Sequence, residues 1–147
     1  MRRTAPTAEV TFRWQRRAAG RLTGPLRQLA ETALASLGHP GVEVGVLLCD
    51  DATIRTLNRR FRARDAATDV LSFPLKAISP EGRHYLGDVA ISVETAGRQA
   101  KAAGATLERE LHVLLLHALV HLAGFDHETD SGEMAALESG LRRELIR

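Results

Sequence analysis

Three histidines in the C-terminal third of the chain have a spacing that suits metal coordination. His117 and His121 are four residues apart, so in a helix their imidazoles project from nearly the same face, one turn apart. Gly124 follows, and a left-handed residue there would end the helix and return His127 toward the same face. The spacing therefore predicts three neutral nitrogen ligands with an open fourth position, as expected of a catalytic zinc ion.

The other histidines are not expected to join this set. His112 lies about 140° around the helix from His117 and so faces elsewhere, in a polar or hydrogen-bonding position. His39 and His84 are interpreted as surface loop residues. Without a metal, the three clustered histidines would need three hydrogen-bond partners, because two of them are embedded in the apolar run VLLLHALVHLAG.

Zinc held by three neutral ligands lowers the pKa of its bound water, so the predicted chemistry is hydrolysis. In the HExxH metalloprotease helix a glutamate base follows the first histidine, and here that position is Ala118, which disfavours a peptidase. Cleavage of an RNA phosphodiester also needs a cation for the charged transition state, and the arginines of NRRFRARD can supply one. If Asp126 supplied a fourth ligand, the case for a catalytic metal would be weaker.

Arginines gather in two segments of the chain. The formal net charge is only +2, but residues 1–27 contain seven arginines against one acid, and residues 55–64 contain five arginines. Guanidinium groups bind phosphate bidentately, so this distribution is compatible with a polyanionic partner. A solvated, arginine-rich surface would explain the same distribution, and charge is therefore only a supporting observation.

Length and composition predict one soluble domain. The 147 residues, 44% of them hydrophobic, suffice for a single domain spanning 1–147 with one core. The sequence shows neither an apolar run long enough for a transmembrane helix nor a secretory signal, so we expect a cytoplasmic location. Cys49 stands alone in VGVLLCDD and is interpreted as a buried strand thiol with no catalytic role.

Hydrophobic periodicity predicts an α+β domain, with a mixed sheet of about four strands, helices packed on it and the metal site at the end of a central helix. Asp51 or its neighbour is expected to cap the second helix, with Phe61 on its apolar side, and Pro74 to stop the third strand. The third and fourth strands are close enough to pair as a hairpin. The expected strands are 8–14, 42–49, 67–75 and 84–93, and the expected helices are 25–38, 52–62, 94–104, 106–123 and 131–146.

Several blocks of the sequence together resemble one family. LNRRFRARDAATDVLSFP, LGDVAIS, the RQA helix and LLLHALVHLAGFDH are similar, in order and spacing, to the YbeY family of bacterial endoribonucleases, also described as rRNA maturation factors. The resemblance runs from about Val42 to Glu138. Its most specific part is the combination of TDVLSFP with the C-terminal histidine block.

The resemblance implies a single zinc ion on His117, His121 and His127, and an essential catalytic arginine at Arg62. It also implies single-strand-specific cleavage of RNA in the maturation of the 16S rRNA 3′ end and in ribosome quality control. The implied partners are single-stranded or ribosomal RNA and components of the small ribosomal subunit, with no DNA and no membrane. The general base is not identified.

Three further arginines, Arg59, Arg60 and Arg64, are expected to bind RNA. One position departs from the family, which usually has HGxLH where this chain has Ala118. Alanine favours the helix, so we expect the ligand geometry to survive while close approach of the substrate backbone is hindered. Two other functions stay open, namely a metal-dependent hydrolase of peptides or small molecules and a non-catalytic ribosome-associated protein with a structural metal.

Overall fold

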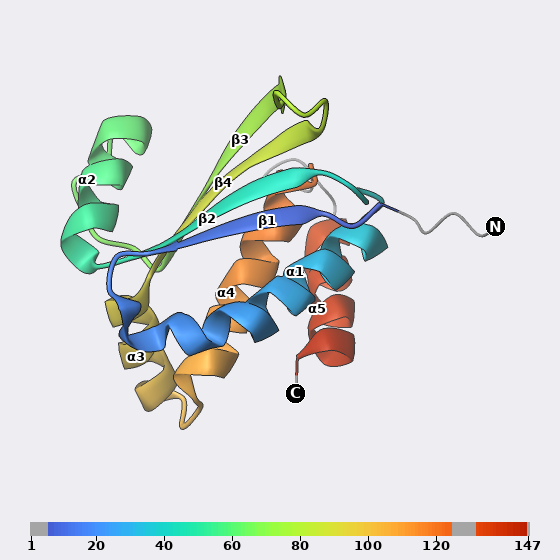
Figure 1. The fold of residues 1–147 in the computed structure, drawn as a ribbon. Helices are drawn as coiled ribbons and strands as arrows, with labels where there is room; N and C mark the ends of the chain where they lie inside the picture. Colours follow the sequence, from blue (N-terminus) through green and yellow to red (C-terminus); the bar gives the residue numbers. More distant parts are fainter. Residues whose placement is uncertain (1–5, 125–131, 147) are drawn as a thin grey trace.

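The chain alternates strands and helices before its largely helical C-terminal part (Figure 1). The structure is a computed structural model that describes residues 6–124 and 132–146. Among the described elements, the hydrophobic pattern does not predict a short 3-10 helix over Arg17–Leu22. The elements are β1 (Glu9–Trp14), η1 (Arg17–Leu22), α1 (Thr23–Ser36), β2 (Glu43–Cys49), α2 (Asp51–Arg62), β3 (Val70–Ile78), β4 (His84–Ser92), α3 (Val93–Ala102), α4 (Leu107–Leu122) and α5 (Glu133–Leu145).

The strands of the described part form one mixed sheet. Their order is β1-β2-β4-β3, with β1 parallel to β2 and β2 parallel to β4. β3 runs antiparallel to β4, which makes these two strands the predicted hairpin and places β3 at one edge of the sheet. The predicted α+β fold, with a mixed sheet of about four strands, is confirmed.

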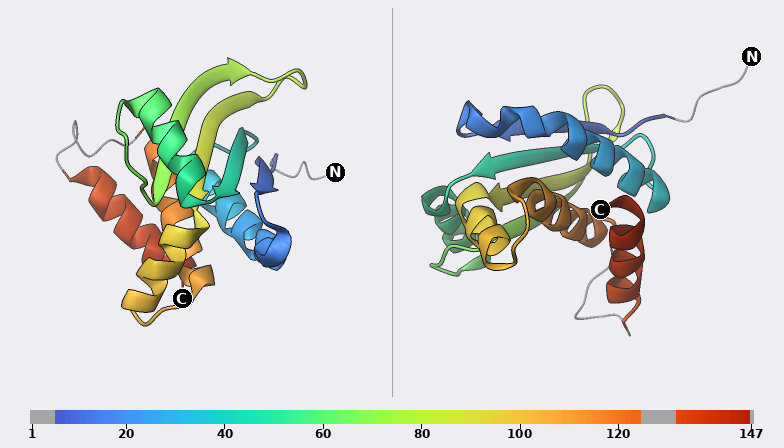
Figure 2. Two further views of the ribbon diagram at one scale, coloured as in Figure 1. Left: turned by 90° about the vertical axis from the view of Figure 1, so that its left-hand side faces the viewer. Right: turned by 90° about the horizontal axis from the view of Figure 1, so that it is seen from below.

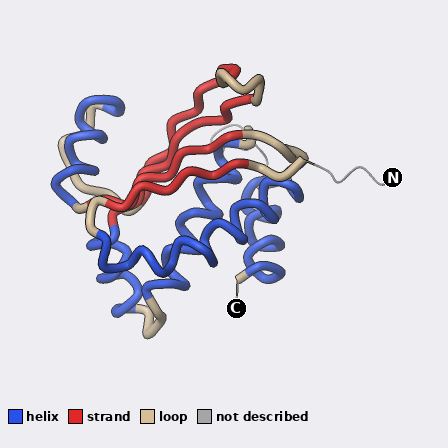
Figure 3. Tube along the Cα trace, in the orientation of Figure 1, coloured by secondary structure: helices blue, strands red, loops and turns tan. Residues whose placement is uncertain are grey.

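Helices lie on both faces of this sheet (Figures 2 and 3). On one face α4 contacts β3 and β4 and is itself contacted by α1, α3 and α5, so it is the central helix of the fold. On the opposite face α2 lies over β3 and β4. None of the described helices is long and apolar enough to span a membrane.

Alternation along β2 divides its side chains between the two faces. Val44, Val46 and Leu48 are buried in the main core, which they share with the leucines of α1 and α4. Cys49 points the other way and forms a smaller cluster with Ile54 of α2 and Ala90 of β4. The sheet therefore carries a large core under α4 and a small one under α2.

The amphipathic pattern of α2 is only partly borne out. Asp50, the neighbour of Asp51, caps the helix with its side chain. Ile54 and Asn58 are buried as their spacing indicates. Phe61 lies one turn further along the same side and its ring contacts Phe73 of β3, but it is 59% exposed, so this end of the apolar side is only partly covered.

Pro74 does not stop its strand. β3 continues through Pro74 to Ile78, with a register shift between Pro74 and Ala77. An edge strand tolerates proline because one side of its backbone has no partner strand to which an N–H could donate. Opposite Pro74, Gly87 has φ +155°, and a Cβ there would lie 2.4 Å from the carbonyl oxygen of Phe73. The hairpin is therefore closely packed at this point and requires glycine.

Candidate active site

The helix α4 holds His117 and His121 on one side, as the spacing predicts. Thr106 caps its N-terminus by accepting the backbone N–H of Arg109 at 3.1 Å. The ring centroids of His117 and His121 lie 6.5 Å apart. Gly124 follows the helix with φ +99°, so the predicted left-handed ending is confirmed. Two imidazoles thus stand side by side near the end of the central helix.

The third predicted ligand, His127, and the alternative ligand Asp126 lie outside the described residues. Within residues 6–124 and 132–146, no group of three or more His, Cys, Asp or Glu side chains is arranged to hold a metal ion. The described residues therefore supply two nitrogen donors, and the three-histidine site stays a prediction.

A cleft of about 730 Å³ brings these histidines together with an arginine far away in the sequence. His117 and His121 line one wall, and Arg62, from the end of α2, lines the same cleft. Ala118 is 1% exposed and also borders the cleft. The other lining residues are Asp69, Val70, Leu71, Ser72, Glu110, Val113, Leu114, Glu138 and Arg142.

Glu138 of α5 orients one of the two histidines. Its Oε1 lies 2.7 Å from Nδ1 of His117, and because a carboxylate only accepts, Nδ1 carries the proton. The remaining ring nitrogen, Nε2, is then the one able to bind a metal ion, an arrangement common around zinc histidines. The hydrogen bond to Glu138 raises the pKa of His117 above its usual value, burial opposes the rise, and the charges of Glu138 and Asp69 add to it.

Arg62 reaches the cleft around the edge strand β3. Its Nη2 donates to the carbonyl oxygen of Ser72, and its guanidinium lies 5.5 Å from the ring centroid of Phe73. The turn after α2 sets this position, because Ala63 adopts a left-handed conformation and buried Asn58 donates to the carbonyl oxygen of Ala66 at 2.9 Å. The guanidinium is thus a positioned cation in the same cleft as the histidines.

The other three predicted arginines do not line this cleft. Arg59, Arg60 and Arg64 are exposed on α2 and in the turn after it. Arg59 approaches Asp65 only at 3.9 Å, and the guanidinium of Arg60 lies 5.8 Å from the ring centroid of Phe61. They therefore stand outside the histidine cleft, and their RNA-binding role stays a prediction.

Three acidic residues of the cleft, Asp69, Glu110 and Glu138, were not singled out from the sequence. Asp69 accepts the backbone N–H of Val70 at 2.7 Å and the side-chain amide of Gln99 at 3.3 Å. It stands inside the TDVLSFP block, so a signal for it was present. Glu138 carries no such signal, because it is one of several glutamates on an amphipathic helix. Its contact with His117 depends on how α5 packs against α4.

His112 and Cys49, which are not expected to belong to the site, do not line the cleft. His112 places Nδ1 2.6 Å from the carbonyl oxygen of Glu108, one turn back on α4, in the hydrogen-bonding position expected of it. Cys49 is buried, and burial together with the charges of Asp50 and Asp51 raises its pKa to about 11. Its thiol is therefore protonated at neutral pH and unsuited to be a nucleophile.

The donor chemistry of the cleft fits zinc. Imidazole nitrogen is a preferred zinc ligand, and a carboxylate behind the ligand is its usual supporting group. A guanidinium in the same cleft adds a site for an anionic oxygen. An imidazole pair facing a fixed cation is suited to hydrolysis at a phosphoester, whose transition state gathers negative charge.

Known proteins resemble this chain in sequence and in fold. The family model described as "Endoribonuclease YbeY" matches residues 12–145. Proteins named "Endoribonuclease YbeY" are 47% identical over 120 residues in an Anaeromyxobacter species and 43% identical over 138 residues in Solibacter usitatus. These alignments cover 80% and 94% of this chain.

The lengths of the relatives differ. The chain spans 62% of the length of the Anaeromyxobacter relative and 88% of that of the Solibacter relative. Among solved structures, the solution structure of TM1509 from Thermotoga maritima matches with a TM-score of 0.64 and 27% identity. That match covers 92% of this chain and 88% of the Thermotoga chain.

Proposed function

Since this chain belongs to the YbeY family, we propose that it is a zinc-dependent, single-strand-specific endoribonuclease. The observation that supports this most strongly is that one cleft unites His117 and His121 of α4 with Arg62 of α2. These residues have the types that phosphodiester hydrolysis requires and come from separate parts of the sequence. We further propose maturation of the 16S rRNA 3′ end, in the cytoplasm and with small-subunit components, as its cellular role.

The residues proposed to hold zinc are His117, His121 and His127. Zinc bound there would polarise a phosphoryl oxygen and lower the pKa of its water toward neutrality. Glu138 fixes the ring of His117 with Nδ1 protonated, so that Nε2 would be the nitrogen that binds the ion. The apolar residues of α4 hold both rings on a rigid helix, which keeps the ligand geometry defined before substrate arrives.

Arg62 is proposed to bind the scissile phosphate. A guanidinium matches the geometry of phosphate oxygens and remains charged at any physiological pH. The Ser72 carbonyl and the Phe73 ring restrain the side chain, so little conformational entropy is lost when the phosphate binds. As negative charge grows on the phosphoryl oxygens, a cation fixed at this point stabilises the transition state.

Two alternative functions are less well supported by the cleft. A peptidase of the HExxH type needs a glutamate at position 118, and buried Ala118 provides no base. A purely structural metal usually has a closed set of protein ligands, whereas these two histidines face an open cleft that also contains Arg62. Both observations favour the proposed ribonuclease over these alternatives.

Substrate choice tests the proposal. Zinc-loaded protein is incubated with a single-stranded RNA that contains the 16S rRNA 3′ end, the same RNA in a duplex, DNA of the same sequence and an unstructured peptide. Only the single-stranded RNA should be cleaved, and His117→Ala should abolish cleavage while His112→Ala retains it. Cleavage of the peptide alone, or RNA cleavage that persists in His117→Ala, would contradict the proposed function.

A further inference from the structure

An exposed aromatic side chain stands among the arginines of α2. Phe61 is 59% exposed, although it lies at a position that hydrophobic spacing assigns to the packed side of the helix. Its ring meets that of Phe73 on β3 at a centroid distance of 5.6 Å and an interplanar angle of 67°. We call these two rings the aromatic shelf. A large apolar ring kept this open to solvent marks a surface suited to binding.

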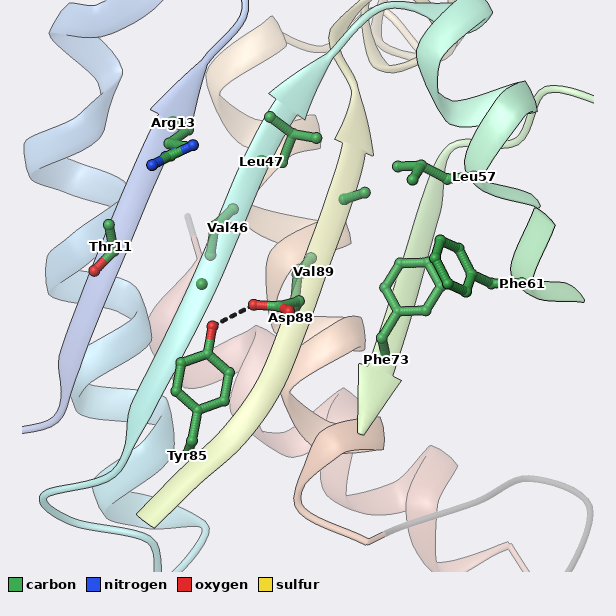
Figure 4. A pocket seen from close by; sticks show the side chains of 12 residues that line it. Thr11, Arg13, Val46, Leu47, Leu57, Phe61, Phe73, Tyr85, Asp88 and Val89 are labelled. Carbon is green, nitrogen blue, oxygen red and sulfur yellow. Dashed lines mark hydrogen bonds between the residues drawn. The ribbon is translucent and has the colours of Figure 1, made fainter. Parts of the chain in front are cut away.

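The aromatic shelf borders a hollow of about 610 Å³ on the face of the sheet that carries α2 (Figure 4). Leu47 and Leu57 contribute apolar surface to the same hollow. At its other end the Tyr85 hydroxyl donates to Asp88, and burial followed by this hydrogen bond raises the pKa of Tyr85 to about 12. Small-molecule sites of roughly 300–1,000 Å³ usually combine apolar walls with a few polar groups, as this hollow does.

The hollow lies on the α2 face of the sheet, whereas the histidine cleft has residues of α4 from the other face and also includes Arg62 beside the edge strand β3. Ser72 lines the histidine cleft and the next residue of β3, Phe73, lines the hollow, so the two depressions are neighbours along this strand. Arg62 joins the two, because it donates to the Ser72 carbonyl while its guanidinium lies 5.5 Å from the Phe73 ring centroid. A phosphate bound by Arg62 would therefore have its neighbouring nucleotide beside the aromatic shelf.

We propose that the aromatic shelf is a stacking subsite for an unpaired base of RNA, next to the phosphate held by Arg62. This inference rests on the proposed ribonuclease function. It adds a physical reason for the preference for single strands over duplexes. A base can stack on Phe61 only when it is not already paired and stacked within a duplex. Single strands would thus gain a contact that duplexes lack.

The charge around the aromatic shelf favours RNA over an apolar protein partner. The guanidinium of Arg60 lies 5.8 Å from the Phe61 ring centroid, and Arg59 and Arg64 are exposed nearby in the sequence. Aromatic rings interleaved with cations are the usual combination in single-strand binding surfaces, where bases stack and cations follow the backbone. An arginine placed over a ring can still bind a phosphate, because the face of the guanidinium contacts the ring while its N–H groups point outward from its edge.

Binding measurements on the full zinc-loaded chain test the subsite. A labelled single-stranded oligoribonucleotide with non-hydrolysable phosphate linkages is titrated by fluorescence anisotropy, and cleavage of the same sequence with ordinary linkages is measured on a gel in parallel. Phe61→Leu keeps an apolar, helix-favouring side chain but removes the ring, so Kd should rise by about 5- to 150-fold, the range expected for one stacked base. Phe61→Trp should retain wild-type affinity, and so should the matched control Ile78→Ala, which alters another exposed apolar residue (61% exposed) on β3.

An RNA carrying a single abasic nucleotide, moved along the sequence, completes the test. At the position that meets the aromatic shelf, the abasic RNA should bind wild-type protein and Phe61→Leu equally. The subsite is rejected if Phe61→Leu binds intact RNA within twofold of wild type, or if it weakens every abasic RNA as much as intact RNA. RNA binding that depends on Phe61 without any cleavage would instead reject the proposed nuclease activity and leave the subsite standing.

Discussion

At the scale of single residues, local spacing revealed the histidines but not what orients them. His117 and His121 follow from the helical repeat alone, because four residues bring two rings to one face. Glu138 contacts His117 only because α5 packs beside α4, and no local pattern encodes that contact. Phe61 shows the same limit. Helical spacing places it on the apolar side of α2, but spacing does not tell how much of that side the sheet covers.

Removal of the carboxylate behind His117 should weaken zinc binding. Glu138→Ala leaves Nδ1 without its acceptor, so the ring is less well oriented, and affinity for zinc should fall by about 10- to 100-fold. Glu138→Gln retains an acceptor oxygen and should recover part of the loss. Competition with a chromogenic chelator measures the affinity, and Glu144→Gln, on the exposed side of the same helix, serves as control. Equal affinities in wild type and Glu138→Ala would disprove the orienting role.

Arg62 should be needed for catalysis but not for the metal. Arg62→Ala removes the cation proposed to stabilise the phosphoryl transition state, and cleavage of single-stranded RNA should slow by about 100- to 1,000-fold. Arg62→Lys should recover only a part, because lysine cannot bind two phosphate oxygens in the same fork. Zinc content, measured on the same samples, should remain at the wild-type level. If Arg62→Ala loses metal and activity together, Arg62 has a structural role instead.

At the scale of elements, the carboxylate of Asp51 links the start of α2 to the start of α3 through hydrogen bonds. Asp51 accepts from the hydroxyls of Ser92 and Thr95, each at 2.6 Å, and from Arg98 at 2.8 Å. The hydrogen bonds from Ser92 and Thr95, more than the Arg98 contact, lower the pKa of Asp51 to about 2 from 3.8. We call these three contacts of Asp51 the clamp. The clamp holds α2, and with it Arg62, in a fixed place beside the sheet.

Asp51→Asn should destabilise the fold by about 2 kcal/mol at pH 7, because a charged acceptor of three hydrogen bonds becomes a neutral amide. The lowered pKa means that the charged clamp stabilises the protein above pH 4, and that this stability is lost as the pH falls toward 2. Urea unfolding at several pH values measures both effects. Asp65→Asn, which affects only exposed contacts with Arg55 and Arg59, should change stability little. A constant difference between wild type and Asp51→Asn from pH 7 to pH 2 would contradict this account.

Most elements could be predicted from the sequence because they depend on near neighbours. The α2 and α4 boundaries follow from a capping side chain and, for α4, a glycine that ends the helix. The extent of β3 could not be predicted in the same way. Pro74 would interrupt an inner strand, and whether a strand lies at an edge depends on the order of the whole sheet.

At the scale of the whole molecule, Arg62 borders both the histidine cleft and the Phe73 ring on the other side of the edge strand. The alternation of strands and helices predicted a mixed sheet, but the order β1-β2-β4-β3 depends on long-range pairing. That order makes β3 an edge strand, and only around an edge can Arg62 border both the histidine cleft and the Phe73 ring. The proximity of Arg62 to the histidines is therefore a property of the fold.

RNA binding by the whole chain should weaken with salt, because its arginines release counterions from the RNA backbone. The logarithm of the binding constant should fall linearly with the logarithm of salt concentration, and each lost phosphate contact should reduce the slope by about 0.7. The double variant of Arg60→Ala and Arg64→Ala should flatten the slope, whereas Arg143→Ala on α5 should not. Binding that is equally tight at low and high salt would rule out this electrostatic surface.

Zinc titration of the metal-free chain tests most directly whether one ion on α4 is required for RNA cleavage. Chelator-treated protein receives increasing zinc, and the rate of cleavage of a single-stranded RNA is followed. We predict no cleavage without zinc, a rise that saturates at one equivalent per chain, and no activity in His121→Ala at any zinc concentration. Full cleavage by metal-free protein, or zinc-dependent cleavage that survives in His121→Ala, would contradict this account.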